Sequence, residues 1–240
     1  MSAVPLLLGH GSPDPAAHAE LVELRGLVSR RLGAEVGLGV LEFPTAGLPP
    51  LMEALAGLRD RSPVAAQPLI LFDGLHGQHD LPAVAAGAAA RFGVEVRLGG
   101  AFGRERRLIE LAAQRMKDED VVDGDLLLFV GRGSSQALAR QQTEEVAAAV
   151  AAAAAIRHLV CYAGISRPGL AEGMEAALDR RPRRVLALPY LLHTGVLVRR
   201  VSEVLTLIAE GRGVELALLP HIGNAPPLVD VVAGRLEQLS

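Results

Sequence analysis

Short runs of apolar residues alternate along the whole chain with longer segments in which apolar residues recur every three or four positions. Runs of roughly four to eight apolar residues predict strands, and the longer spacing predicts amphipathic helices. Four strands are predicted in the first half: 4–9, 36–42, 69–73 and 94–98. Four more are predicted in the second half: 126–131, 156–161, 185–189 and 214–218. The pattern therefore predicts two successive βαβαβαβα units.

Several of these strands are apolar on successive residues rather than on alternate ones, as 6–8 and 126–130 show. Such runs are typical of strands covered on both faces, which is a property of parallel sheets. Between the first two strands, Asp14 and Pro15 are suited to begin a helix and Gly33 to end it. We therefore predict an α/β fold of two similar tandem lobes, each with a mainly parallel four-stranded sheet flanked by helices.

Individual residues recur at nearly constant spacing in the two halves. The clearest pairs are Pro68 with Pro189 and Gly74 with Gly195. A period this long indicates a duplicated domain rather than a solenoid. We predict that the first lobe spans residues 1–120 and the second 121–240, with a polar connection near 117–125.

Composition narrows the class of protein. The 240 residues are 50% hydrophobic, with a net charge of -3 and an aromatic content of 3%. Such a chain offers neither a basic stripe nor stacking platforms, so we expect no nucleic-acid partner. The single cysteine cannot form an internal disulfide, and the first residues lack the charged region that precedes a secretory apolar core. Without an apolar run of about 18 residues, we expect a cytoplasmic protein with no membrane partner.

Histidines follow two of the predicted strands of the first lobe. His10 lies between glycines, which allow a ligand to approach the backbone. His76 and His79 follow the third predicted strand, and ligands of parallel α/β sheets bind at the carboxyl ends of strands. His10 and His76 lie at similar distances beyond their predicted strands, so we expect them to face one crevice, with His79 facing solvent. The alternative for each is a structural ring bonded to a backbone carbonyl in a tight turn.

Glu42 ends the second predicted strand and adds a carboxylate to the same edge. Two imidazoles and a carboxylate suit a borderline divalent ion such as Fe²⁺, Co²⁺, Ni²⁺ or Zn²⁺. Because no thiolate is nearby, the set favours transient handling of the ion over a closed structural zinc site. A glutamate at a strand end could equally cap a helix.

The second lobe has different side chains at the equivalent positions. Arg132 replaces His10, and Leu197 replaces His76. An arginine at this edge could hold a carboxylate with two hydrogen bonds. His193, near the end of the third strand of this lobe, either lines the pocket or is a buried, hydrogen-bonded histidine.

Taken together, these motifs resemble the class II chelatases, which are the sirohydrochlorin chelatases of the SirB and CbiX type. The segments that carry the resemblance are Leu-Gly-His-Gly-Ser at 8–12, Leu-Glu-Phe at 41–43, Pro-Leu-Ile-Leu-Phe at 68–72, Gly-Leu-His at 74–76 and Asp-Leu-Pro at 80–82. Segments 131–135, 162–164 and 188–197 are similar to the matching lobe of the long, two-lobed members. The resemblance covers nearly the whole chain.

The resemblance implies a lyase that inserts Fe²⁺ or Co²⁺, with Ni²⁺ as a further candidate, into sirohydrochlorin on the way to siroheme or cobalamin. It implies the metal as substrate and no organic cofactor, and His10 and His76 match the paired active-site histidines of the family. The chain departs from the family pattern in two ways. The segment Gly-Gln-His at 77–79, between His76 and Asp80, is unusual, and the second lobe has neither of the two active-site histidines. We therefore expect one active site per chain, in a monomer or homodimer.

The chemistry fits these residues. Metal insertion requires pyrrole N–H protons to leave while a hydrated ion sheds water, so a neutral imidazole can act as base or as temporary ligand. We expect the carboxylate-rich tetrapyrrole to lie between the lobes, with Ser12, Arg132 and His193 as contacts. The alternative is a non-catalytic carrier of metal or tetrapyrrole. A phosphate-binding protein ranks last, because neither glycine turn matches a nucleotide-binding motif.

Overall fold

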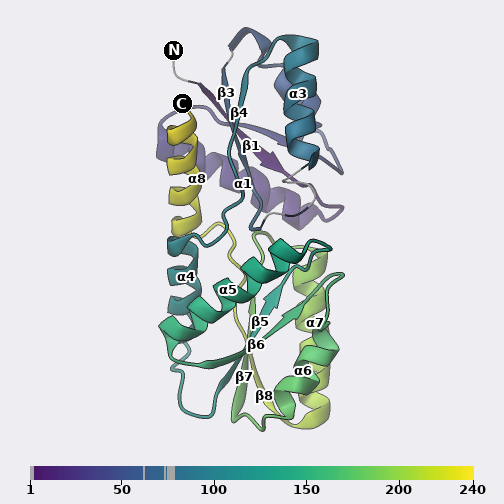
Figure 1. Cartoon of the computed structure of the whole chain (residues 1–240), viewed down its shortest axis with the longest axis vertical. Coiled ribbons are helices and arrows are strands. Elements are labelled where there is room, and N and C mark those ends of the chain that lie inside the picture. Colours follow the sequence, from purple (N-terminus) through teal and green to yellow (C-terminus); the bar gives the residue numbers. More distant parts are fainter. Residues whose placement is uncertain (1–2, 62, 73, 75–78) are drawn as a thin grey trace. The chain divides into compact units, whose positions relative to one another are not determined.

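Eight strands of the described chain form two four-stranded sheets in which every pairing is parallel (Figure 1). The computed structural model describes residues 3–61, 63–72, 74 and 79–240. The strand order is β2-β1-β3-β4 in the first sheet and β6-β5-β7-β8 in the second, so the second half repeats the topology of the first. The predicted α/β fold of two similar lobes is confirmed.

The strands are β1 (Val4–Gly9), β2 (Gly37–Val40), β3 (Val64–Pro68), β4 (Val96–Leu98), β5 (Leu126–Gly131), β6 (Arg157–Tyr162), β7 (Arg184–Pro189) and β8 (Glu215–Leu218). The helices are α1 (Pro15–Leu32), α2 (Leu51–Ala56), α3 (Leu81–Phe92), α4 (Arg106–Lys117), α5 (Ala137–Ala154), α6 (Leu170–Leu178), α7 (Val196–Arg212) and α8 (Pro226–Leu239), with a short 3-10 helix at Arg59–Arg61. None of the helices in the described chain has the length and apolar content needed to cross a bilayer.

The prediction of the third strand at 69–73 is wrong. β3 occupies Val64–Pro68, is buried along its whole length and pairs with both β1 and β4. The residues after Pro68 are larger and more apolar than the alanines before it, which is why the apolar pattern favoured them. The sequence repeat indicates the correct end of this strand, because Pro68 matches Pro189, the last residue of β7.

The first helix shows how local sequence sets the ends of an element. The Asp14 carboxylate accepts a hydrogen bond from the Ala16 amide at 2.9 Å, and Pro15 occupies the first turn. Gly33 ends the helix in the left-handed conformation with φ 62°. These are the cap residues that the sequence predicts, and they fix where the chain leaves β1 and enters α1.

The compact units of the fold do not follow the two sequence repeats. Unit 1 comprises Met1–Gly103 and Asn224–Ser240, and unit 2 comprises Arg104–Gly223. Helix α4, the last helix of the first repeat, packs on α5 in unit 2, and α8, the last helix of the second repeat, packs on α1 and β3 in unit 1. The compact units thus differ from the predicted lobes 1–120 and 121–240, because each unit contains the last helix of the other repeat.

One arginine in each of these last helices binds the loop that follows the edge strand of its unit. Arg115 of α4 donates hydrogen bonds to the carbonyls of 220–222 at 2.5 to 2.9 Å. Arg235 of α8 donates to the carbonyls of 100–102 at 2.8 to 3.2 Å. Burial lowers the pKa of Arg115. The repeat therefore duplicates not only the sheet but also the contact that holds its last helix.

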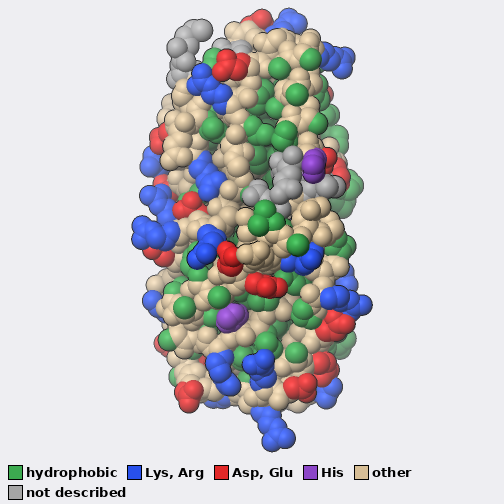
Figure 2. Space-filling model, viewed as in Figure 1, with side chains coloured by type: hydrophobic (Ala, Val, Ile, Leu, Met, Phe, Trp, Pro, Cys, Tyr) green, Lys and Arg blue, Asp and Glu red, His purple; other side chains and the backbone are tan. Residues whose placement is uncertain are grey.

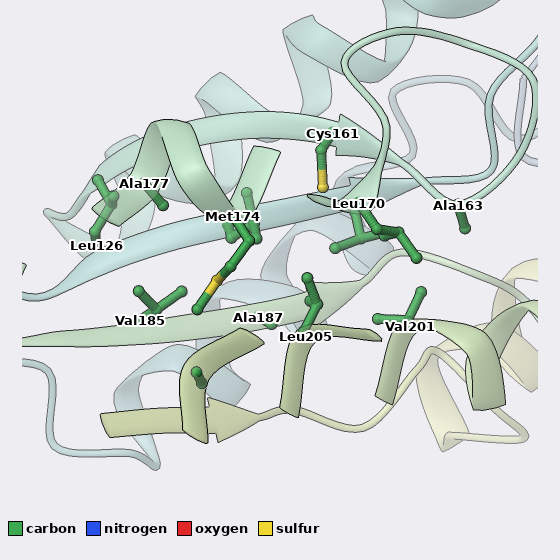
Figure 3. Close-up of a cluster of buried hydrophobic side chains, with 13 residues drawn as sticks. Leu126, Cys161, Ala163, Leu170, Met174, Ala177, Val185, Ala187, Val201 and Leu205 are labelled. Atoms are coloured by element: carbon green, nitrogen blue, oxygen red, sulfur yellow. The ribbon is translucent and has the colours of Figure 1, made fainter. Parts of the chain in front are cut away.

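One core cluster of unit 2 lies between β5, β6 and β7 on one side and α6 and α7 on the other (Figure 3). Cys161 and Met174 are fully buried there, beside Leu205. A side chain at Gly173 would place its Cβ atom 2.3 Å from that of Cys161, so glycine is required where α6 approaches the sheet. On the face of the molecule shown in Figure 2, charged side chains of both signs are interspersed.

Candidate functional site

The backbone at the carboxyl ends of β1 and β2 brings His10 and Glu42 side by side. The Leu41 amide donates to the Gly9 carbonyl at 3.1 Å, and the Glu42 amide donates to the His10 carbonyl at 2.9 Å. The two strands thus stay hydrogen-bonded beyond their last paired residues. These bonds hold the backbones of His10 and Glu42 together at one edge of the sheet, where the sequence predicts a histidine and a carboxylate.

Gly11 makes this close approach possible. Its φ of +91° is a conformation that residues with side chains rarely adopt, and an added Cβ atom would lie 1.9 Å from the Glu42 carbonyl oxygen. The sequence motif Gly-His-Gly suggested space for a ligand. The structure gives a second reason for Gly11, since only glycine lets the backbone of Glu42 lie against this turn.

The His10 imidazole is half-buried, and its Nδ1 lies 3.2 Å from the Gly11 carbonyl oxygen. Because a carbonyl only accepts, this contact favours the tautomer with the proton on Nδ1. Nε2 then carries the lone pair that can take a proton or bind a metal ion. A hydrogen bond to a backbone carbonyl is expected of a structural histidine. In His10 the same bond also orients the ring so that Nε2 can react.

Ser12 helps to form the turn into α1. Its Oγ accepts a hydrogen bond from the Asp14 amide at 3.1 Å. Asp14 in turn caps the helix, so Ser12 supports the cap. Because the Ser12 oxygen accepts this bond, its hydroxyl proton can still be donated to a bound carboxylate.

His76 lies outside the described residues, so its approach to His10 stays a prediction. The two histidines do not lie at similar distances beyond their strands, because His10 directly follows β1 whereas His76 comes eight residues after Pro68, the end of β3. His79 is exposed, as predicted. Asp80 occupies the N-cap of α3, but its side chain makes no capping hydrogen bond. Among the residues that the structure describes, no three His, Cys, Asp or Glu side chains form a metal site.

Unit 2 has the same backbone arrangement with different side chains. The Gly164 amide donates to the Arg132 carbonyl at 2.9 Å, as Glu42 does to His10. Gly133 has a φ of +90°, almost the value of its counterpart in unit 1. The second unit therefore keeps the fold of this edge, while an exposed arginine replaces the imidazole and a glycine replaces the carboxylate.

His193 follows β7 in unit 2 and is half-buried, with both ring nitrogens shielded from solvent. Tyr190, at the start of the same loop, is fully buried, and burial together with the nearby Glu105 carboxylate raises its pKa. Arg132 is exposed by contrast. Of the two predicted contacts in this unit, Arg132 is thus the one open to a ligand from solvent.

Comparison with known proteins places these features in a family. A family model described as CbiX matches the chain twice, at residues 5–119 and 126–239. The chain belongs to the CbiX family. The resemblance inferred from the motifs is confirmed, and the two matches correspond to the two repeats. His10 and Arg132 hold equivalent places in them.

Named relatives of this CbiX-family chain are chelatases. It is 28% identical over 180 residues to a sirohydrochlorin ferrochelatase of Priestia megaterium, covering 73% of this chain and 67% of the relative. It is 22% identical over 243 residues to a sirohydrochlorin cobaltochelatase of the same organism, covering 97% of this chain and 78% of the relative.

Solved structures share the fold. SirB from Bacillus subtilis subspecies spizizenii in complex with cobalt superposes with a TM-score of 0.81 at 21% identity, over 100% of this chain and 95% of that one. SirB from Bacillus subtilis with Fe³⁺ superposes with a TM-score of 0.83 at 20% identity, over 100% and 96%. At about 20% identity, these superpositions show that the chains share the two-lobed fold.

Proposed function

We propose that this chain is a sirohydrochlorin chelatase, a lyase that inserts a divalent metal ion into sirohydrochlorin. The observation that carries the proposal is the edge of unit 1, where His10 is oriented by the Gly11 carbonyl and tied through its backbone to Glu42. The membership of both repeats in the CbiX family and the names of the relatives support the same activity.

His10 performs two tasks in this proposal. With the Nδ1 proton directed at a carbonyl, Nε2 binds the incoming ion and then takes up a pyrrole proton as the ion enters the macrocycle. His76 is the second imidazole, and Glu42, whose side chain is exposed, is a third ligand for the ion. Such a small ligand set suits an ion that must leave the protein again, since a closed four-ligand site would retain it.

The tetrapyrrole is held through its carboxylates. Ser12 offers a hydroxyl proton at the edge of unit 1, and Arg132 offers a guanidinium that can bind a carboxylate with two hydrogen bonds. His193 is the further contact in unit 2. Because Arg132 stands where His10 stands in the other repeat, the duplicated edge binds substrate in one unit and performs chemistry in the other.

Fe²⁺ and Co²⁺ are the proposed metal substrates, for siroheme and cobalamin respectively, and Ni²⁺ is a third that the same ligands accept. Affinity for nitrogen and oxygen ligands rises from Fe²⁺ to Ni²⁺ whatever the biological role, so metal supply selects among them. We further propose that the enzyme needs no organic cofactor and acts in the cytoplasm as a monomer or homodimer, without nucleic acid or membrane.

The test is an anaerobic assay of purified protein with excess sirohydrochlorin and each of Fe²⁺, Co²⁺ and Ni²⁺, followed by absorbance. Many insertions per chain, at a rate proportional to protein concentration, are expected for at least one ion. Formation of no more than one equivalent of product or complex per chain would instead identify a carrier and overturn the proposal.

A further inference from the structure

Phe43 lies at the edge of unit 1 and ends the Leu-Glu-Phe motif at 41–43, but the sequence assigns it no role. Its aromatic side chain is 47% exposed, and its backbone is left-handed with φ 51°. Residues with side chains pay a conformational penalty there, which for a bulky residue makes the position an outlier. Pro44 follows directly and restricts Phe43 further. A strained, exposed phenylalanine next to Glu42 calls for a reason beyond folding.

The loop that carries Phe43 is held at both ends. Before it, the Glu42 amide is bonded to the His10 carbonyl at 2.9 Å. After it, Thr45 and Leu48 exchange two backbone hydrogen bonds at 3.0 and 2.9 Å, and the Leu48 side chain is buried. The exposed Phe43 ring therefore belongs to an anchored loop, and Phe43 directly follows the residue whose backbone is bonded to His10.

The repeat provides an independent comparison. In unit 2 the residue after Gly164 is Ile165, whose side chain is 78% exposed. It occupies the place of Phe43, one residue beyond the backbone bond between the two loops. At this edge the histidine and the glutamate have been replaced, but a large apolar side chain still faces solvent. Neither core packing nor metal chemistry explains why both repeats have a large, exposed apolar side chain at this position.

We propose that Phe43 binds the flat face of the tetrapyrrole ring at the edge that carries His10, an inference that rests on the proposed chelatase function. Carboxylates lie around the rim of such a substrate, so arginines and hydroxyls hold its circumference, and His10 acts at its central nitrogens, which leaves the apolar area of its face without a contact. An aromatic ring supplies that contact, because conjugated rings attract in offset or edge-to-face arrangements and the exposed half of Phe43 leaves water. Phe43 is thus a substrate contact that selects for a conjugated macrocycle.

The decisive variant is Phe43→Asn, since asparagine accepts the left-handed backbone but has no apolar face. The KM for sirohydrochlorin is expected to rise about tenfold, the factor that corresponds to losing about 1.4 kcal/mol of binding. The KM for the metal ion should stay the same, and the unfolding temperature should stay within about 3 °C of wild type, because relief of backbone strain offsets lost packing. Phe43→Tyr should keep the wild-type KM.

Leu207→Asn is the matched control, because Leu207 is 71% exposed on the surface of α7 and should leave the KM for sirohydrochlorin unchanged. The inference is overturned if Phe43→Asn leaves that KM unchanged, or if it lowers the unfolding temperature by more than about 5 °C and alters both KM values alike. Wild-type turnover is measured first, since its absence overturns the proposed function. A metal-free titration of sirohydrochlorin into wild type and Phe43→Asn then tests the contact on its own.

Discussion

Replacing Gly11 by alanine tests whether the approach of the β1 and β2 loops organises the site. Gly11 has no side chain, so any effect of the substitution on activity must come through the local backbone, which includes the Gly11 carbonyl that orients His10. The matched control is Gly133→Ala, which makes the same change at the equivalent position of unit 2.

The structure predicts different effects for Gly11→Ala and Gly133→Ala. Both glycines have nearly the same φ, +91° and +90°, so alanine costs each about 1 to 3 kcal/mol of backbone strain. At Gly11 the new Cβ atom would lie 1.9 Å from the Glu42 carbonyl oxygen, whereas at Gly133 the nearest atom is the Ser166 amide nitrogen at 3.1 Å. Because Cβ atoms essentially never approach other atoms within 3.0 Å, the first substitution forces the backbone to shift by about 1 Å, whereas the second requires only a few tenths of an ångström.

Insertion kinetics and urea unfolding measure the two effects. Gly133→Ala should lose about 1 to 3 kcal/mol of stability with kcat nearly unchanged. Gly11→Ala should lose at least as much stability and also about 100-fold in kcat/KM, because a displacement of about 1 Å at a reacting group has that effect. Equal kcat/KM values for the two variants, at a temperature where both are folded, would show that the contact between Gly11 and Glu42 does not organise the site.

Three further predictions concern the structure that supports the site. Burial opposes ionisation of Asp125, but its hydrogen bonds to Arg184, at 2.9 Å, and to the Val122 amide, together with the charges of Arg184 and Arg183, outweigh burial and lower its pKa. Wild type should therefore lose stability as the pH falls through that pKa, below about pH 4. In urea titrations Asp125→Asn should be about 3 kcal/mol less stable at pH 7 and less sensitive to acid, and an unchanged acid transition would contradict this. Burial raises the pKa of Cys161 to about 12, so iodoacetamide at pH 8 should label the thiol only after unfolding, as mass spectrometry would show. Arg115→Leu and Arg235→Leu should each lower the free energy of unfolding by about 2 to 4 kcal/mol, and a loss in only one of them would show that the two contacts are not equivalent.

Much of the fold was predictable because the strands are short, apolar and regularly spaced. β1 and β5 match their predicted bounds, and the caps of α1 at Asp14 and Gly33 follow from residue type alone. β3 was misplaced because its alanines and Gln67 carry little hydrophobic signal, although every one of its residues is buried. In a strand covered on both faces, burial depends on the neighbouring strands and helices, and the apolar pattern records that only in part.

The exchange of helices between the repeats could not be predicted. α4 presents a buried face of Leu108, Ala112 and Met116, and that pattern is the same whichever unit it covers. The three carbonyl contacts of Arg115 decide the location, and they depend on the shape of a loop far along the chain. Sequence periodicity identifies that a helix packs, whereas only the tertiary structure identifies its partner.

The candidate site was predictable in its residue types and less so in its geometry. His10 and Glu42 follow from chemistry-bearing residues at strand ends, and the structure joins their backbones. The tight contact at Gly11 and the exposed ring of Phe43 depend on a left-handed φ at each residue. A glycine or a phenylalanine in a loop has many structural uses, so neither residue shows its role without coordinates.

In the proposed mechanism, the imidazoles of His10 and His76 handle the metal ion. The most direct test is the initial rate of insertion by the double variant His10→Ala, His76→Ala, measured anaerobically with the ion that wild type uses best. The expected rate is close to that of sirohydrochlorin and metal without protein, and the unfolding temperature of the double variant should be close to that of wild type. A double variant that inserts metal at the full wild-type rate would contradict it.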